Sequence, residues 1–405
     1  MKKNLKILSL LLVICLTLGA CNTMTDKVKE AQSTVISSDF SENFESLEEE
    51  FSAEEKQEGK IENIASEEPS EGEHSEALSA MELVKEMGIG WNLGNSLDPV
   101  DCTWLTDEMA YETAWGNPAV TKELISFVKS QGFRTVRIPV TWKNHMGPAP
   151  DYTISSQWLD RVEEVVNWCL EEDLYVILNI HHESSWIINA SRDYEGFRQQ
   201  YDALWNQIAG RFADYPETLI FESMNEIGFD DLGEEAGCLL LNKINAHFTQ
   251  LIRQSGGNNH ERFLLLAGYW TDIDASCKGS VLPEDDRVML SVHFYAPAAF
   301  AIAEPGTSWG YQYSWGTEEE IAYVESQMKK LSDTFVSRGI PVIIGEFGSL
   351  REGKDSEAVN LYYSTIIKYA KAYGICPVLW DNGQEIDRTN YAFRYSGCKE
   401  AIFGE

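Results

Sequence analysis

From residue 81 onward, short apolar runs alternate along the chain with longer stretches in which apolar side chains recur at helical spacing. The runs lie at residues 87–92, 133–139, 174–180, 218–224, 263–267, 288–293, 341–346 and 375–380. Most of them are apolar at both alternating sets of positions, which is typical of parallel strands with helices outside and packed side chains inside. The pattern predicts eight buried strands separated by helices.

Helix signals fall between these runs. Asn117-Pro118 reads as a cap followed by a first-turn proline, Gly132 as the stop of the same helix, and apolar residues recur helically from Trp158 to Leu170. The segment from Met81 to Glu405 has the length of one (β/α)8 TIM barrel. A doubly wound open sheet would also alternate, but the first run, which contains Gly88-Ile89-Gly90, is not followed by a glycine-rich phosphate loop.

The first eighty residues do not share this pattern. Residues 1–20 contain lysines followed by an apolar run, which ends at Leu18-Gly19-Ala20-Cys21. This pattern predicts a bacterial lipoprotein signal peptide with Cys21 as the lipidated N-terminus. Ordinary secretion with cleavage nearby is the alternative. Residues 21–80 are rich in Glu and Ser and predict an acidic, disordered linker before a barrel domain at 81–405. We therefore expect an extracellular protein, tethered to the cell surface or secreted.

Charge and cysteine spacing exclude several classes of partner. The formal net charge is −33 at pH 7, and the chain stays strongly negative when the acidic linker and the signal lysines are left out, which argues against binding nucleic acid or adsorbing to anionic lipid. The only membrane contact we expect is the lipid anchor at Cys21. The cysteines of the barrel domain show no C-x-x-C spacing, so a zinc site is not indicated. We expect a monomer without a metal.

Polar residues gather at the C-terminal ends of the predicted strands, which in a parallel barrel open into one mouth. In strand order they are Trp91 and Asn92, Arg137, His181 and His182, Asn225 and Glu226, Trp270, His293 and Tyr295, Glu346, and Trp380. One histidine or carboxylate at a strand end is more often a structural residue or a helix cap. Random placement would scatter such residues over both ends of the strands, so their shared location predicts a functional site.

Two of these residues are carboxylates that we expect to meet across the mouth. Glycoside hydrolysis with retention needs one carboxylic acid to protonate the leaving oxygen and a second carboxylate, about 5–5.5 Å away, to attack the anomeric carbon. We assign Glu226 as the acid/base and Glu346 as the nucleophile. Arg137 and Tyr295 would keep Glu346 ionised, whereas partial desolvation and the charge of Glu346 would keep a proton on Glu226. Asn225 would hydrogen-bond the sugar 2-hydroxyl.

Six segments, in order, resemble glycoside hydrolase family 5. They are Gly88-Ile89-Gly90-Trp91-Asn92-Leu93-Gly94-Asn95, Thr135-Val136-Arg137-Ile138-Pro139-Val140, Asn179-Ile180-His181-His182, Met224-Asn225-Glu226, His293-Phe294-Tyr295 and Ile344-Gly345-Glu346-Phe347. The resemblance implies a retaining mechanism without metal or organic cofactor, with His181 as the family histidine and Trp380 as the platform beneath a sugar. One departure is Ile227, where family members often have proline. The substrate-binding set is then Trp91, Asn92, Arg137, His181, His182, Asn225, His293, Tyr295 and Trp380.

We therefore expect an endo-β-1,4-glucanase that acts on cellulose-like or mixed-linkage glucan. A xyloglucanase or a β-mannanase would use the same residues. A non-catalytic surface lipoprotein that binds glycans is the alternative of another class, and the presence of both carboxylates speaks against it. Aromatic residues in the predicted loops could extend a polysaccharide cleft or simply fold those loops onto the barrel; they are Trp186, Trp309, Tyr311, Tyr313 and Trp315.

Overall fold

The computed structural model describes residues 78–404, so the predicted signal peptide and nearly all of the predicted linker lie outside it. Eight parallel strands form a closed barrel in which each pairs with the next and β1 pairs with β8. The strands are β1 Gly90–Leu93, β2 Thr135–Ile138, β3 Tyr175–Asn179, β4 Leu219–Glu222, β5 Leu264–Ala267, β6 Val288–Phe294, β7 Val342–Phe347 and β8 Cys376–Asp381. Each overlaps a predicted run, and the predicted (β/α)8 fold is confirmed.

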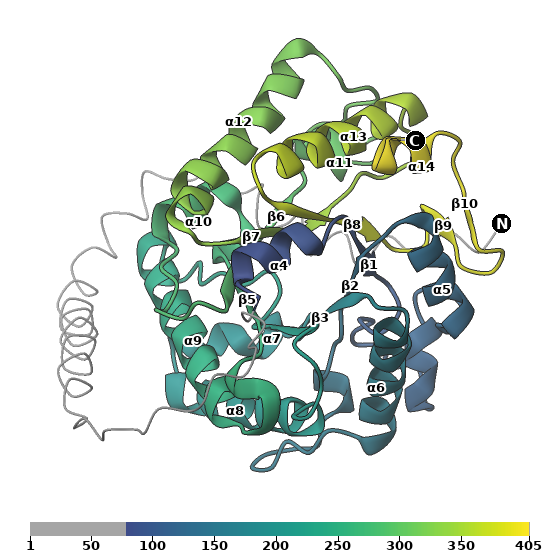
Figure 1. Cartoon of the computed structure of the whole chain (residues 1–405). Coiled ribbons are helices and arrows are strands. Elements are labelled where there is room, and N and C mark those ends of the chain that lie inside the picture. The colour runs from purple at the N-terminus through teal and green to yellow at the C-terminus, as the bar shows by residue number, and fades with distance from the viewer. Residues whose placement is uncertain (1–77, 405) are drawn as a thin grey trace, which may run out of the picture. The chain divides into compact units, whose positions relative to one another are not determined.

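Helices surround the ring of strands (Figure 1). The longer ones are α5 Lys122–Gln131, α6 Ser156–Glu171, α8 Tyr194–Arg211, α9 Glu234–Gln254, α12 Glu318–Thr334 and α13 Ser356–Ala372. The shorter ones are α4 Ala80–Glu86, α7 Ser184–Ile187, α10 Ile273–Gly279, α11 Ala298–Ala301 and α14 Cys398–Phe403. Six 3₁₀ helices lie at η1 Glu108–Thr113, η2 Lys143–His145, η3 Ile188–Ser191, η4 Gly257–His260, η5 Tyr269–Thr271 and η6 Val336–Arg338.

The start of α5 differs from the prediction. The helix begins at Lys122, where the side chain of Thr121 accepts a hydrogen bond from a backbone N–H of the first turn. The Asn117 amide instead donates to backbone carbonyls of the loops after β1 and β8. The predicted stop is confirmed, because Gly132 has a φ of 114°, which side chains strain to adopt. Asn117 therefore joins the first and last strands of the barrel.

The barrel interior has two layers. Near the N-terminal ends of the strands the inward side chains are apolar and pack against α4, which lies across this end of the ring (Figure 1). This lower layer comprises Ile177, Ile220, Leu265, Met289, Ile343 and Val378. Alternate side chains of a strand share a face, so the residues two positions further along also point inward, and on five of the strands they are polar. This upper layer contains Asn92, Arg137, Asn179, Glu222 and Ser291, all fully buried, and it forms the floor of the mouth.

Two features of the chain were not predicted. A short antiparallel pair, β9 Ile386–Asp387 and β10 Ala392–Phe393, follows β8. A buried ion pair between Arg351 and Glu385, 2.8 Å long, ties the segment after β8 to the loop after β7. Among residues 78–404, none of the helices is both long enough and apolar enough to cross a bilayer.

Candidate active site

The two predicted catalytic carboxylates meet in the mouth of the barrel. Glu346 lies in β7 and Glu226 follows β4, and one side-chain oxygen of each lies within 4.8 Å of the other and of a ring nitrogen of His293. His293 Nδ1 is 2.8 Å from Glu226 Oε1 and 3.6 Å from Glu346 Oε2. The Glu226 side chain is 27% exposed and that of Glu346 is 7% exposed. This separation suits the retaining rather than the inverting geometry.

Glu346 is held by one cation and one hydroxyl. Arg137 Nη1 lies 2.7 Å from Glu346 Oε1, and the Tyr295 hydroxyl donates to Oε2 at 2.9 Å. Both contacts favour the ionised form of the Glu346 carboxyl group. They also orient its two oxygens within the mouth.

Burial and neighbouring charges affect the two carboxyl groups differently. For Glu346, burial dominates and, together with the charge of Glu226, raises its pKa, although His293 and Arg137 oppose the rise. For Glu226, burial is outweighed by the hydrogen bond and charge of His293, with smaller contributions from Arg137 and His182, so its pKa is lowered. We expected desolvation and Glu346 to keep a proton on Glu226, but in the free site His293 opposes this. The same site therefore shifts the pKa values of the two carboxyl groups in opposite directions.

Two residues of the predicted substrate-binding set lie buried in the floor of the mouth, where they support other side chains. Arg137 is fully buried and contacts Glu222 Oε2 through Nε at 2.6 Å. It also donates to Asn92 Oδ1 at 3.0 Å and to Asn225 Oδ1 at 2.8 Å. Asn92 is fully buried as well and donates to a backbone carbonyl of β7. Arg137 and Asn92 thus position Glu346 and Asn225.

The structure contradicts the predicted substrate-binding role of Trp91. Its side chain is fully buried in the core between strands and helices, and its indole N–H donates to Asp381 Oδ2 at 2.9 Å. The next residue, Asn92, points into the barrel. Successive side chains of a strand point to opposite faces, so only one of these neighbours can reach the mouth.

Histidine and tryptophan rings form one wall of the mouth. The ring of His181 lies parallel to that of Trp380, with centroids 5.8 Å apart and planes at 7°. His182 meets His181 edge-on at 4.5 Å. Burial lowers the pKa of His182 to about 4 and that of His181 well below its usual value, so both rings are neutral near pH 7. Gly94 is required here, because a Cβ at this position would lie 2.8 Å from a ring carbon of Trp380.

The loop aromatics divide into two groups. Trp315 is buried, Trp186 stacks on Phe197, and Lys354 lies over the half-buried ring of Tyr311, so these three aromatics fold their loops onto the barrel. Trp309 and Tyr313 are 42% and 59% exposed and remain available to a polymer. Trp104, in the loop after β1, is 63% exposed and was not among the predicted residues.

Several polar residues around the site were missed by the sequence analysis. Glu222, inside β4, accepts hydrogen bonds from Asn179 Nδ2 at 3.0 Å and from Ser291 Oγ at 2.8 Å, in addition to its contact with Arg137. Their signal was present in the sequence, since each is a polar residue within an otherwise apolar run. Asp98 is also fully buried, and burial raises its pKa to about 7.

Two groups among the described residues bring three potential metal ligands within 4.8 Å of one another. In the group of Glu226, His293 and Glu346, Nδ1 of His293 already lies close to an oxygen of each carboxyl group. The second group is Asp98, His181 and His182, in which Asp98 Oδ2 has no hydrogen-bond partner. The suitability of this second group depends on which nitrogen of His181 carries its proton.

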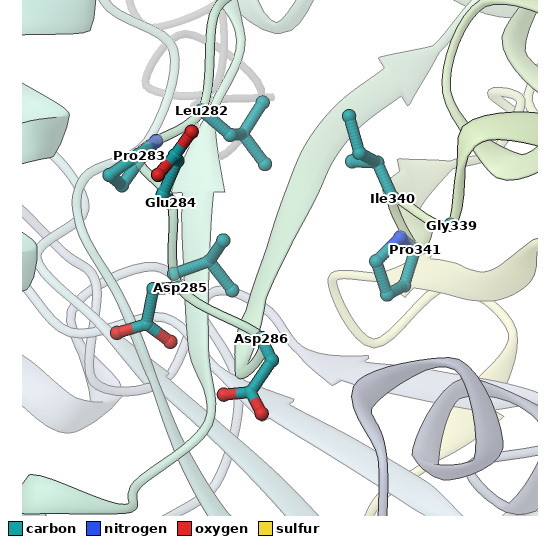
Figure 2. A pocket seen from close by; sticks show the side chains of 9 residues that line it. Leu282, Pro283, Glu284, Asp285, Asp286, Gly339, Ile340 and Pro341 are labelled. Carbon is teal, nitrogen blue, oxygen red and sulfur yellow. The ribbon is translucent and has the colours of Figure 1, made fainter.

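A separate pocket of about 400 Å³ lies at the other end of the barrel. Figure 2 shows that Glu284, Asp285 and Asp286 line it on one side and Ile340 and Pro341 on the other. These residues precede β6 and β7, so the pocket opens at the N-terminal ends of the strands. It is therefore remote from the paired carboxylates.

Comparison with known proteins agrees with this geometry. Residues 101–386 match the model of the cellulase family, described as glycosyl hydrolase family 5. The chain belongs to glycosyl hydrolase family 5. It is 39% identical to Endoglucanase A of Paenibacillus barcinonensis over 342 residues, covering 76% of this chain and 83% of the relative. It is also 39% identical to Endoglucanase A of Ruminococcus albus over 314 residues, covering 76% and 84%.

Solved structures of the same family share the barrel. A broad-specificity endoglucanase of subfamily 4 from Clostridium acetobutylicum superposes with a TM-score of 0.73 at 35% identity, covering 80% of this chain and 99% of that one. A family 5 lichenase from Caldicellulosiruptor sp. F32, in complex with cellotetraose, gives 0.75 at 32% identity, covering 85% and 97%. The alignment thus covers nearly the whole length of these two solved chains.

Proposed function

We propose that this family 5 protein is an endo-β-1,4-glucanase that cleaves cellulose-like or mixed-linkage glucan by double displacement. The observation that carries the proposal is the meeting of Glu226 and Glu346 with His293 within 4.8 Å in the mouth of the barrel. Similarity to endoglucanases and to a lichenase bound to cellotetraose supports a glucan substrate.

The proposed reaction uses the two carboxyl groups in turn. Glu226 donates its proton to the glycosidic oxygen while Glu346 attacks the anomeric carbon, so the leaving chain departs and a glycosyl-enzyme ester forms. Glu226, now ionised, removes a proton from water, which attacks the same carbon and releases Glu346. Arg137 and Tyr295 hold the nucleophile during both steps, and Asn225 is oriented by Arg137 toward the sugar 2-hydroxyl.

The polymer would lie along an aromatic path. Trp380 would support the sugar beside the scissile bond, and its position is maintained by the parallel ring of His181. The exposed rings of Trp309, Tyr313 and Trp104 would stack on sugars farther along the chain. His182 and His293 would complete the polar wall around the reacting sugar.

Hydrolysis of a panel of polysaccharides tests this function. We expect reducing sugar from carboxymethylcellulose and barley β-glucan, with a rapid early fall in viscosity because an endo enzyme cuts inside the chain. The first product should carry the β-anomer, as retention requires. Xyloglucan or glucomannan as the preferred substrate would favour the xyloglucanase or β-mannanase alternative. Binding of oligosaccharide without turnover would favour the non-catalytic glycan-binding lipoprotein.

The same proposal includes export and attachment. The lipobox-like ending at Cys21 supports a surface lipoprotein, with residues 21–80 as an acidic tether and the barrel as a monomer. Radiolabelled palmitate should enter the wild-type protein in bacteria and not a Cys21→Ala variant. Release of the unlabelled wild-type protein into the medium would favour ordinary secretion, and sedimentation of the secreted barrel would give its mass.

A further inference from the structure

Asn179, at the end of β3, has an amide whose orientation is decided by its neighbours. The backbone N–H of Val140 donates to Asn179 Oδ1 at 3.2 Å, and Asn179 Nδ2 lies 3.0 Å from Glu222 Oε2. A backbone N–H can only donate, and a carboxylate paired with Arg137 accepts. The oxygen and nitrogen of this amide therefore cannot be exchanged, although such groups are often ambiguous.

The second proton of the same amide meets His181. Asn179 Nδ2 lies 3.1 Å from His181 Nδ1, so this ring nitrogen must offer its lone pair. Burial and the nearby charges of His182, Arg137 and His293 all disfavour a doubly protonated ring, which lowers the pKa of His181. A neutral imidazole has one proton, and that proton is left for Nε2.

We propose that Asn179 and Glu222 are positioning residues that hold His181 in the Nε2–H tautomer, so that it donates a hydrogen bond to a sugar oxygen in the mouth. Only the sugar contact rests on the proposed function; the tautomer follows from the hydrogen bonds alone. The parallel ring of Trp380 fixes the plane in which this donor points.

The arrangement links the nucleophile to the histidine. The guanidinium of Arg137 contacts both Glu346 and Glu222. Glu222 in turn accepts hydrogen bonds from the Asn179 amide and the Ser291 hydroxyl. Each partner is buried, so each has few alternative orientations. The guanidinium of Arg137, which holds Glu346, therefore also acts through Glu222 and Asn179 to determine which nitrogen of His181 donates a hydrogen bond.

The same tautomer argues against a metal at the second ligand group. Nδ1 of His181 is occupied by Asn179, and Nε2 carries the proton, so neither nitrogen has a free lone pair. The group of Asp98, His181 and His182 therefore does not fit a metal, in spite of the short separations.

Nitrogen-15 NMR of histidine-labelled protein tests the tautomer without reference to activity. Long-range proton–nitrogen correlations distinguish Nε2–H from Nδ1–H rings, and loss of one ring pattern in a His181→Gln variant assigns the signal. We expect the Nε2–H pattern in the wild type near neutral pH. An Nδ1–H or doubly protonated pattern would overturn the proposal, whether or not any variant folds.

The variant Asn179→Asp removes the proton offered to His181. We expect the ring proton to move from Nε2 to Nδ1, where the new carboxylate accepts it, and kcat/KM on β-glucan to fall about tenfold or more because Nε2 no longer donates to the sugar. Asn245→Asp is the matched control, because Asn245 is a buried amide that bonds Ser223 and a backbone carbonyl and should leave the His181 pattern unchanged. A folded Asn179→Asp protein that keeps Nε2–H would refute the mechanism.

The two parts of the proposal can fail separately. An Nε2–H ring in a protein without glucanase activity would reject the proposed function and keep the tautomer. Normal glucanase activity with an Nδ1–H ring would reject the positioning roles of Asn179 and Glu222 and keep the function.

Discussion

The lower and upper layers of the barrel interior share the same strands but do different work. In the lower layer, side chains such as Leu265 and Met289 are apolar, buried and packed against α4. In the upper layer, two residues further along the strands, Glu222 and Ser291 are just as buried, but Ser291 donates a hydrogen bond to Glu222, and Glu222 also pairs with Arg137. Burial alone therefore does not distinguish the part that stabilises the fold from the part that organises the chemistry.

The difference shows how the barrel can hold several charges without water. Arg137 is fully buried, and its cost of desolvation is offset by contacts with Glu222 and Glu346 and by hydrogen bonds to two asparagines. The apolar layer below keeps this network dry. Loss of one partner would leave a buried charge unpaired, so the upper layer tolerates little change.

The largest effect is expected above the upper layer, at the nucleophile. Glu346→Ala should reduce kcat on β-glucan by about four orders of magnitude or more, because no glycosyl-enzyme can form. Steady-state kinetics, with calorimetric binding of cellotetraose as a control, would measure the loss. Normal turnover by this variant would refute the assignment of the nucleophile.

Next in size is the acid/base variant Glu226→Ala. On β-glucan we expect a loss of about 10²–10⁴-fold, since the leaving sugar then departs without a proton. Formation of the glycosyl-enzyme from an aryl cellobioside with an activated leaving group should be much less affected. Burst kinetics on both substrates make the comparison, and equal losses would contradict the role of Glu226.

Substitutions in the lower layer should lower the stability of the fold and have little effect on the catalytic rate. Leu265→Ala should lower the free energy of unfolding by about 2–5 kcal/mol by leaving a cavity, with little change in kcat. Ser291→Ala is the matched change in the upper layer, and it should lower kcat several-fold through Glu222 at a stability cost of about 1 kcal/mol. Denaturant titration and kinetics of both variants would show whether the layers are separable.

A smaller effect is a shift in pH dependence. His293 lowers the pKa of Glu226 and opposes the raised pKa of Glu346, so in His293→Ala both pKa values should rise. The alkaline limb of kcat/KM reports loss of the acid's proton, and the acidic limb reports ionisation of the nucleophile. Both limbs should move to higher pH, and the maximum value of kcat/KM should be lower than in the wild type. A shift to lower pH would contradict this account of the pair.

The strands and the paired carboxylates could be predicted because they depend on patterns local in sequence. The sequence did not show whether Trp91 or Asn92 points into the barrel, because both follow an apolar run that is buried on each side. Asn117-Pro118 resembled a helix start, yet its amide is used by loops distant in sequence. The roles of Asn179 and Glu222 arise only when neighbouring strands place them side by side.

Helix α4 has a consequence for attachment. It covers the end of the barrel opposite the mouth, and the described chain begins just before it, with Leu78 packed in the same cluster. The first described residue therefore lies on the side of the domain away from its mouth. Attachment of the domain at this edge, to a solid support for example, would leave the mouth open to insoluble polymer.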